Sequence, residues 1–225
     1  MDSTYSIAVT SFLVGLSGAM MPGPVLTVTV GETAARLRGD SASGRPLLRG
    51  AAVGPLVVLG HGLLEVALIL AIVLGVGNLL TRTPVVGTIG ILGGGVLIWM
   101  AWGMLRSLKT LTLATPATLA VTRRHPVWAG ILTSVSNPYW TLWWTTVGLG
   151  YLALAARIGP AGLLAFYVGH ICSDLVWYSA ISCSLVLGHR LLTDRVYRGV
   201  VAACAVFLLG FGCYFGVAGV RLLTA

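Results

Sequence analysis

The sequence predicts an all-α membrane protein whose six transmembrane helices form two inverted three-helix repeats. Of its 225 residues, 57% are hydrophobic and only 9% are charged, whereas soluble domains carry about 25% charged residues. The charged residues cluster between apolar stretches long enough to cross a bilayer, which takes about 20 helical residues. Three features also recur in the same order in both halves. The chain is therefore expected to be a single transmembrane domain, residues 1–225.

Six apolar stretches give the six predicted helices. Four of them contain no charged residue, and the second and fifth each contain one carboxylate, Glu65 and Asp174. The first stretch lacks the basic start and the cleavage pattern of a signal peptide, so it is expected to remain in the mature protein. The predicted helices lie within residues 3–31, 50–81, 83–105, 125–156, 158–189 and 199–220.

The basic residues between the stretches predict the orientation. The second and fourth connections hold only Arg82 and Arg157, and the C-terminal tail holds Arg221. Short connections rich in Lys and Arg stay in the cytoplasm, so we expect both termini outside. This placement also accounts for the net charge of +8 without nucleic-acid binding. The first, third and fifth connections hold Arg36, Arg38, Arg45, Arg49, Arg106, Lys109, Arg123, Arg124, Arg190, Arg195 and Arg198.

The order of motifs predicts the repeat. The proposed halves are residues 1–105 and 127–225, joined by a basic cytoplasmic loop at residues 106–126 that is partly helical or mobile. Each half has a helix breaker, then a Gly-His-x-x-x-acid motif, then a glycine pair at four-residue spacing suited to close helix contact. The glycine pairs are Gly90 with Gly94 and Gly212 with Gly216. They suit packing within a protomer or in a homo-oligomer.

The helix breakers are the Met21-Pro22-Gly23-Pro24 motif of the first predicted helix and the Ser136-Asn137-Pro138-Tyr139 motif of the fourth, and they mark the expected substrate site. Proline inside a helix removes a backbone hydrogen bond and clashes with the preceding turn, and non-helical backbone at membrane depth must be buried in protein or line a cavity. A simple bend is the alternative for a single proline. Two breakers at related places favour a ligand site at the middle of the membrane. The expected substrate-binding residues are Pro22, Gly23, Pro24, Asn137, Pro138, Tyr139 and Trp140.

The two Gly-His-x-x-x-acid motifs supply the candidate ion-coupling residues His61, Glu65, His170 and Asp174. A rise of 1.5 Å per residue places both histidines near the middle of their helices. The spacing of four puts each histidine and its acid on one helix face. Buried membrane carboxylates mark ion pathways by default, although a neutral His-carboxyl bond for packing is the alternative. The same four residues could also supply ligands to a divalent metal such as Zn or Mn.

The motifs Met20-Met21-Pro22-Gly23-Pro24 and Ser136-Asn137-Pro138, with the apolar spans, the basic loop and Asp174, resemble the LysE/RhtB family of amino-acid exporters. The resemblance covers nearly the whole chain. It implies a multi-pass exporter in the cytoplasmic membrane of a prokaryote, driven by the membrane gradient without ATP. Tyr139 and Trp140 follow the Asn-Pro pair where these exporters often carry Lys or an aliphatic residue, so the solute stays open.

The expected function is export of amino acids or related small solutes by proton-coupled antiport, with alternating access around the breaks. The runner-up is export of a divalent metal. Tyr139, Trp140, Trp143 and Trp144 could face a cationic solute, although packing or lipid contact is favoured slightly. The sequence has no phosphate-binding loop, and we expect neither a cofactor nor enzymatic activity.

Two other classes fit poorly. A metalloprotease needs His-Glu-x-x-His, and the motif at residues 61–65 has its acid at the wrong offset. A membrane thiol carrier needs cysteines at the breaks, but all four cysteines lie in the last two spans without a Cys-x-x-Cys pair.

Overall fold

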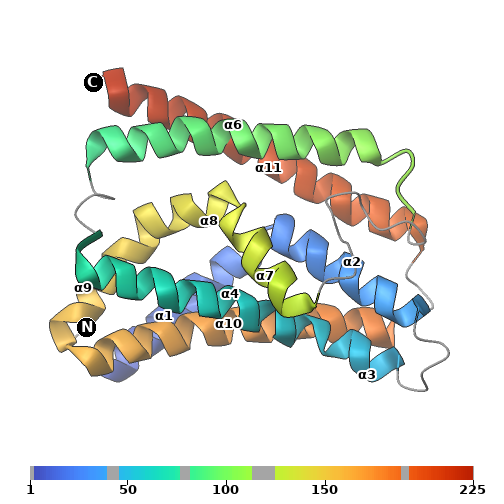
Figure 1. Cartoon of the computed structure of the whole chain (residues 1–225), viewed down its shortest axis with the longest axis horizontal. Coiled ribbons are helices and arrows are strands. Elements are labelled where there is room, and N and C mark those ends of the chain that lie inside the picture. Colours follow the sequence, from blue (N-terminus) through green and yellow to red (C-terminus); the bar gives the residue numbers. More distant parts are fainter. Residues whose placement is uncertain (1–2, 40–45, 77–81, 113–124, 189–192, 225) are drawn as a thin grey trace.

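The computed structural model describes residues 3–39, 46–76, 82–112, 125–188 and 193–224, and almost all of them are helical (Figure 1). This confirms the predicted all-α class. Much of the loop predicted at residues 106–126 lies outside these ranges. The helices are α1 (Thr4–Ala19), α2 (Pro24–Gly39), α3 (Pro46–Ala51), α4 (Val53–Ala71), the π-helix η1 (Ile72–Val76), α6 (Thr83–Ser107), α7 (Pro126–Val135), α8 (Pro138–Trp143), the π-helix η2 (Trp144–Gly148), α9 (Leu149–Ile158), α10 (Pro160–Leu187) and α11 (Asp194–Thr224).

Four helical segments are long and apolar enough to cross a membrane, and α1 with α2 makes a fifth if the bent pair is one span. The four are Leu47–Gly75, Thr83–Ser107, Pro160–Leu187 and Asp194–Thr224. The predicted fourth helix is divided among α7, α8, η2 and α9, each too short to cross alone. The count of six spans and the inverted repeat therefore remain predictions.

Both predicted breaks are present. Between α1 and α2 the chain turns by 72°, at the residues where Pro22 and Pro24 prevent a continuous helix. The second break separates α7 from α8 at Ser136 and Asn137. There the Asn137 side chain accepts a hydrogen bond from the Tyr139 backbone N–H (3.1 Å) and so caps α8.

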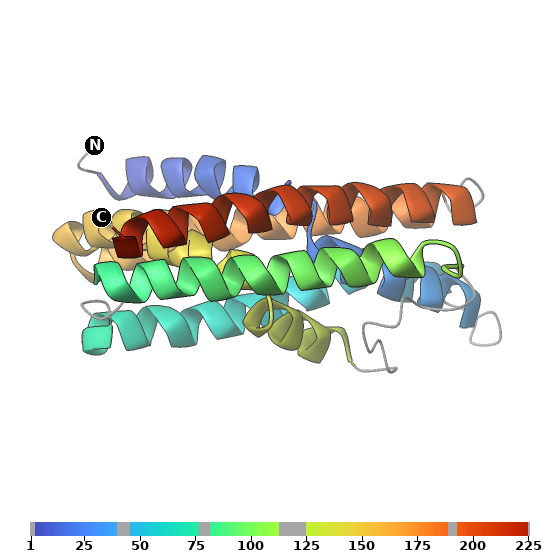
Figure 2. The same cartoon turned by 90° about the horizontal axis from the view of Figure 1, so that it is seen from above.

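The predicted glycine pairs lie where α6 and α11 cross, side by side in Figures 1 and 2. A Cβ atom on Gly94 would lie 2.6 Å from the Gly212 carbonyl oxygen and 2.8 Å from the Gly216 nitrogen. A Cβ on Gly90 would lie 3.1 Å from the Gly219 Cα. Only glycine permits this backbone approach, so these glycine faces meet within one protomer.

Two further helix pairs explain the glycine of each Gly-His motif. A Cβ on Gly60 of α4 would lie 1.9 Å from the Val127 carbonyl oxygen of α7. A Cβ on Gly169 of α10 would lie 2.3 Å from the Ala8 carbonyl oxygen of α1. Each helix that carries a histidine therefore packs closely against the first segment of a broken helix from the other half of the chain.

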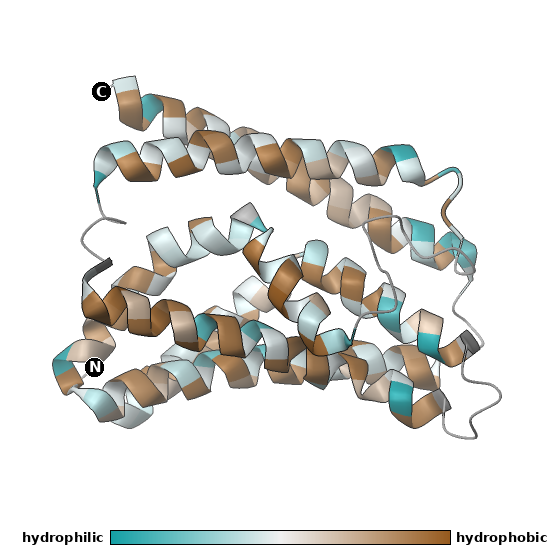
Figure 3. Cartoon of the chain, in the orientation of Figure 1, coloured by the Kyte–Doolittle hydropathy of each residue, from teal (hydrophilic) through white to brown (hydrophobic). Residues whose placement is uncertain are grey.

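The hydropathy of the helices is uneven along the molecule. Figure 3 shows hydrophilic residues gathered at the end where α2 stops, α3 begins, α6 ends and α11 begins. There Arg36 forms an ion pair with the buried Glu32, and the Arg198 side chain donates to the Leu111 carbonyl (2.7 Å). Apolar side chains cover most of the remaining helix surface, as expected where lipid is the solvent.

Candidate functional site

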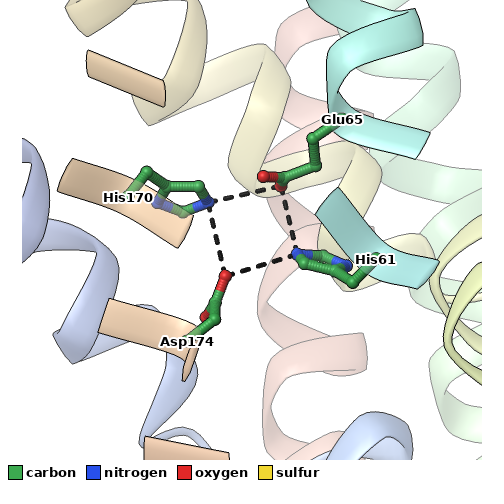
Figure 4. A group of neighbouring side chains, drawn as sticks. All are labelled: His61, Glu65, His170 and Asp174. Atoms are coloured by element: carbon green, nitrogen blue, oxygen red, sulfur yellow. Dashed lines mark hydrogen bonds and ion pairs between the residues drawn. The ribbon is translucent and has the colours of Figure 1, made fainter. Parts of the chain in front are cut away.

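The two His-acid motifs converge into one cluster, the quartet His61, Glu65, His170 and Asp174 (Figure 4). The spacing of four places the two residues of each motif on one helix face, and the contact of α4 with α10 brings the faces together. Glu65 Oε1 lies 3.2 Å from His61 Nε2 and 3.3 Å from His170 Nε2. Asp174 Oδ2 lies 3.5 Å from His61 Nε2 and 3.8 Å from His170 Nε2. Imidazole and carboxylate therefore alternate around a ring.

Glu65 is the more completely bonded of the two acids. It is fully buried, and its Oε1 accepts hydrogen bonds from the indole N–H of Trp144 (2.9 Å) and of Trp140 (3.2 Å). Both indoles lie at the α8–η2 junction, just past the Asn-Pro break. A buried carboxylate needs such donors because its charge has lost its water, so these bonds stabilise Glu65 as an anion.

Asp174 is held less tightly. It is 4% exposed, and its Oδ2 has no hydrogen-bond partner among the described residues. Its two imidazole contacts, at 3.5 and 3.8 Å, are longer than those of Glu65. Glu65 Oε2 is likewise buried without a hydrogen-bond partner among the described residues. Buried oxygens in this state are available to a proton, a cation or a solute.

The two histidines have different surroundings. His61 Nδ1 lies 2.7 Å from the Ser134 hydroxyl of α7, which leaves Nε2 toward the two acids. The His170 ring stacks on Trp143, with centroids 4.6 Å apart, and lies parallel to Phe166 at 6.1 Å. His170 Nδ1 is buried without a hydrogen-bond partner among the described residues.

A cavity joins the quartet to both helix breaks. His61, Glu65, His170 and Asp174 line it together with the α1–α2 connection and the start of α8. Its remaining walls come mainly from α1, α10 and α11. The cavity is thus enclosed by segments from both halves of the chain. Its lining residues are Gly15, Gly18, Ala19, Met21, Pro22, Gly23, Pro24, Val25, Val58, His61, Glu65, Asn137, Tyr139, Trp140, Trp143, His170, Asp174, Tyr178, Phe207 and Leu208.

Six of the seven predicted substrate-binding residues line this cavity: Pro22, Gly23, Pro24, Asn137, Tyr139 and Trp140. The seventh, Pro138, begins α8, and its side chain lies outside what the structure describes. Trp140 has a second contact that the sequence did not predict, its bond to Glu65.

Sequence reasoning missed Ser134 and Phe207 as parts of the site, and it named Trp144 only as a possible contact for a cationic solute. The buried indole N–H of Trp144 reaches Glu65, but the run of aromatic residues gives no sign of which one does so. Ser134 belongs to the short helix before the Asn-Pro break, and its position just upstream of that breaker was the one available signal.

The quartet also has the composition of a metal site. Its four ligand atoms lie within 4.8 Å of one another. Zinc bound at about 2.0–2.1 Å by four such atoms separates neighbouring ligands by roughly 3.4 Å. The four His-to-acid distances, 3.2–3.8 Å, fall around that separation. The two carboxylates need positive charge, and either protons on the imidazoles or one divalent cation would supply it.

Several apolar spans surrounding a cavity with buried ionisable groups and two broken helices define a multi-pass membrane transport protein. A family model described as "LysE type translocator" matches residues 16–219. The chain belongs to this family of translocators.

One curated relative is "Putative amino acid efflux protein YcgF" of Bacillus subtilis (strain 168). The two sequences are 31% identical over 96 residues, which cover 42% of this chain and 46% of the relative. The matched segment thus spans about half the length of that protein. No solved structure matches the chain.

Proposed function

We propose that this protein exports amino acids or related small solutes by proton-coupled antiport, with alternating access around the cavity. One observation carries the proposal: the two helix breaks and the His-acid quartet line the same cavity. Exposed backbone groups at helix breaks recognise solutes, and buried acids carry ions. The family match and the efflux protein named among its relatives support export as the direction of transport.

The solute binds between the breaks. The amide groups at the start of α2 take its carboxylate, and the last carbonyls of α1 take an ammonium group. Tyr139 and Asn137 close the cavity from the α8 side. Solute and coupling ion therefore share one cavity, so that binding of one can exclude the other, as antiport by competition would use.

The quartet carries the coupling ion. Its two carboxylates lie in the membrane interior with two imidazoles, and the described cavity lining contains neither Lys nor Arg. The charge of the site is therefore balanced by protons that the quartet binds and releases. Asp174 is the exchanging acid because its bonds are long, while Glu65 remains the anchored anion.

Alternating access follows from the repeat. The packing of α4 against α7 and of α10 against α1 pairs each histidine helix with a broken helix from the opposite half. This pairing of helices between the two halves supports a mechanism in which two inverted halves rock against each other around a fixed site. The basic ends of α2, α3, α6 and α11 face the cytoplasm in this proposal, with both termini outside.

The test uses purified protein in proteoliposomes with an imposed pH gradient and labelled amino acids. Wild type drives solute against its gradient, and both Asp174→Asn and Glu65→Gln abolish this movement. Asp194→Asn, an acid at the start of α11 outside the cavity, is the matched control and keeps transport. If no amino acid responds to the pH gradient in wild type, the proposal is wrong.

A divalent metal is the second candidate cargo, favoured by the grouping of four ligand atoms within 4.8 Å. Elemental analysis of the purified protein and uptake of Zn²⁺ or Mn²⁺ into the same vesicles decide between the two. If Zn²⁺ or Mn²⁺ copurifies with the protein and is taken up into the vesicles, and Asp174→Asn abolishes both the binding and the uptake, the cargo is a divalent metal and not an amino acid.

A further inference from the structure

We infer that a groove on the outer surface of α6 and α11 binds an anionic phospholipid, with an acyl chain along the groove and the phosphate on Arg106 and Lys109. The site lies apart from the solute cavity, and it does not depend on which solute is transported. It combines an apolar surface suited to a hydrocarbon chain with two unpaired cations at one end of that surface.

The groove runs along the face of α6 that lies beside α11. Ile98, Trp99, Trp102 and Leu105 of α6 form one wall, and Leu209 of α11 forms the facing wall. The α6 residues are three or four positions apart and therefore share one helix face. Trp99 is 70% exposed and Trp102 is 57% exposed, so both indoles present broad apolar surface to the bilayer. Acyl chains are as apolar as these side chains and suit the groove.

Two cations lie at the end of the groove where α6 ends. Arg106 and Lys109 are both exposed. A backbone bond from the Leu111 N–H to the Ser107 carbonyl (2.8 Å) continues the helical turn past the end of α6. The spacing of three therefore places both cations on one face. No described acid pairs with either of them, so their charge is available to a lipid phosphate.

One contact joins the groove to these cations. Arg106 Cζ lies 5.2 Å from the ring centroid of Trp102, which is itself part of the groove wall. Stacking on an indole face leaves the N–H donors at the edge of the guanidinium free. Those donors can bind a phosphate through two parallel hydrogen bonds. The contact therefore holds Arg106 where the head group of a lipid in the groove would lie.

A phospholipid suits this groove better than a second copy of the chain does. A two-fold dimer within one membrane has its axis along the membrane normal, so the same residues of the two copies meet at the same depth. Pairing through this face would bring Arg106 and Lys109 of one copy toward the same cations of the other. An anionic head group instead neutralises these charges.

The experiment is native mass spectrometry of the purified protein with equal amounts of phosphatidylglycerol and phosphatidylcholine that carry the same acyl chains. Each Lys or Arg near an anionic lipid strengthens binding about fivefold. We therefore expect wild type to bind phosphatidylglycerol about 25-fold more tightly than phosphatidylcholine. The double variant Arg106→Gln with Lys109→Gln should reduce this preference to less than about twofold.

The matched control is the double variant Arg82→Gln with Arg221→Gln. It removes the same charge from two exposed arginines at the opposite end of α6 and α11, and it should keep the preference of wild type. Equal binding of the two lipids by wild type would overturn the inference, and so would a preference that survives in the Arg106 and Lys109 variant. A dimer in place of lipid-bound protein would assign the groove to a second copy and would also overturn it.

A second measurement locates the acyl chain. Phosphatidylglycerol with brominated acyl chains is added as a minor component of phosphatidylcholine vesicles that contain the protein. We expect it to quench tryptophan fluorescence more strongly than its share of the lipid predicts, because its chain lies against Trp99 and Trp102. The excess quenching should disappear in the Arg106 and Lys109 variant. Quenching in wild type that only matches the share of brominated lipid would contradict the placement of the chain in the groove.

Discussion

Replacing Trp144 by phenylalanine tests whether Glu65 depends on its indole donors. The side chain of Trp144 is 1% exposed, and its N–H donates to Glu65 Oε1 at 2.9 Å. A hydrogen bond to a charged group contributes about 1.5–3 kcal/mol. The smaller phenyl ring also leaves unfilled volume, which costs about 1–2 kcal/mol at a buried site. We expect Trp144→Phe to lower the free energy of unfolding by about 2.5–5 kcal/mol.

The assay is unfolding by sodium dodecyl sulfate in mixed micelles, followed by circular dichroism. A double-mutant cycle with Glu65→Leu separates the hydrogen bond from the lost volume. The coupling free energy of the cycle should be about 1.5–3 kcal/mol. Trp99→Phe is the matched control, because Trp99 is 70% exposed on α6, and it should change stability by less than about 0.5 kcal/mol. A coupling free energy near zero would refute the assignment of Trp144 as a donor to Glu65.

Three further outcomes are expected. Gly60→Ala should prevent close packing of α4 on α7 and abolish transport in the proteoliposomes, because its Cβ would lie 1.9 Å from a carbonyl oxygen. Gly95→Ala is the control and should keep full transport, because a Cβ there would have nothing within 4 Å. Arg36→Ala should destabilise the protein by about 3–5 kcal/mol in the detergent assay, since it leaves the buried Glu32 unpaired. Adding Glu32→Gln should recover part of that loss, and no recovery would show that the ion pair is not the cause. Asn137→Ala should lower the free energy of unfolding by about 1 kcal/mol, because the cap of α8 is lost. Asn137→Ser should retain most of the stability of the wild type, because serine also caps helices. Equal losses in the two variants would contradict the cap.

The sequence predicted the local features of the fold well because they depend on neighbouring residues. The expected span at residues 83–105 is α6, Thr83–Ser107, and the span at residues 158–189 contains α10, Pro160–Leu187. Pro22 and Pro24 broke the first helix as predicted, since proline acts through its own ring and missing N–H. The spacing of four in each His-acid motif also placed each pair on one helix face.

The site itself depends on how helices cross, which periodicity does not determine. The sequence offered the quartet as two His-acid motifs that could together hold a metal, and only the packing of α4 on α10 shows that His170 of one motif lies 3.3 Å from Glu65 of the other. For the aromatic cluster, packing or lipid contact was favoured slightly over contact with a cationic solute, and Trp144 is buried. Its bond to Glu65 was missed because a helical sequence does not show which neighbour an indole N–H will face.

The quartet takes two residues from each half of the chain, and this has a consequence for biosynthesis. Glu65 leaves the ribosome 105 residues before His170. Through that interval, the nascent protein holds a carboxylate in its apolar second span without the partner from α10. The early helices can therefore enter the bilayer long before Glu65 meets His170, and completion of the quartet must wait for α10.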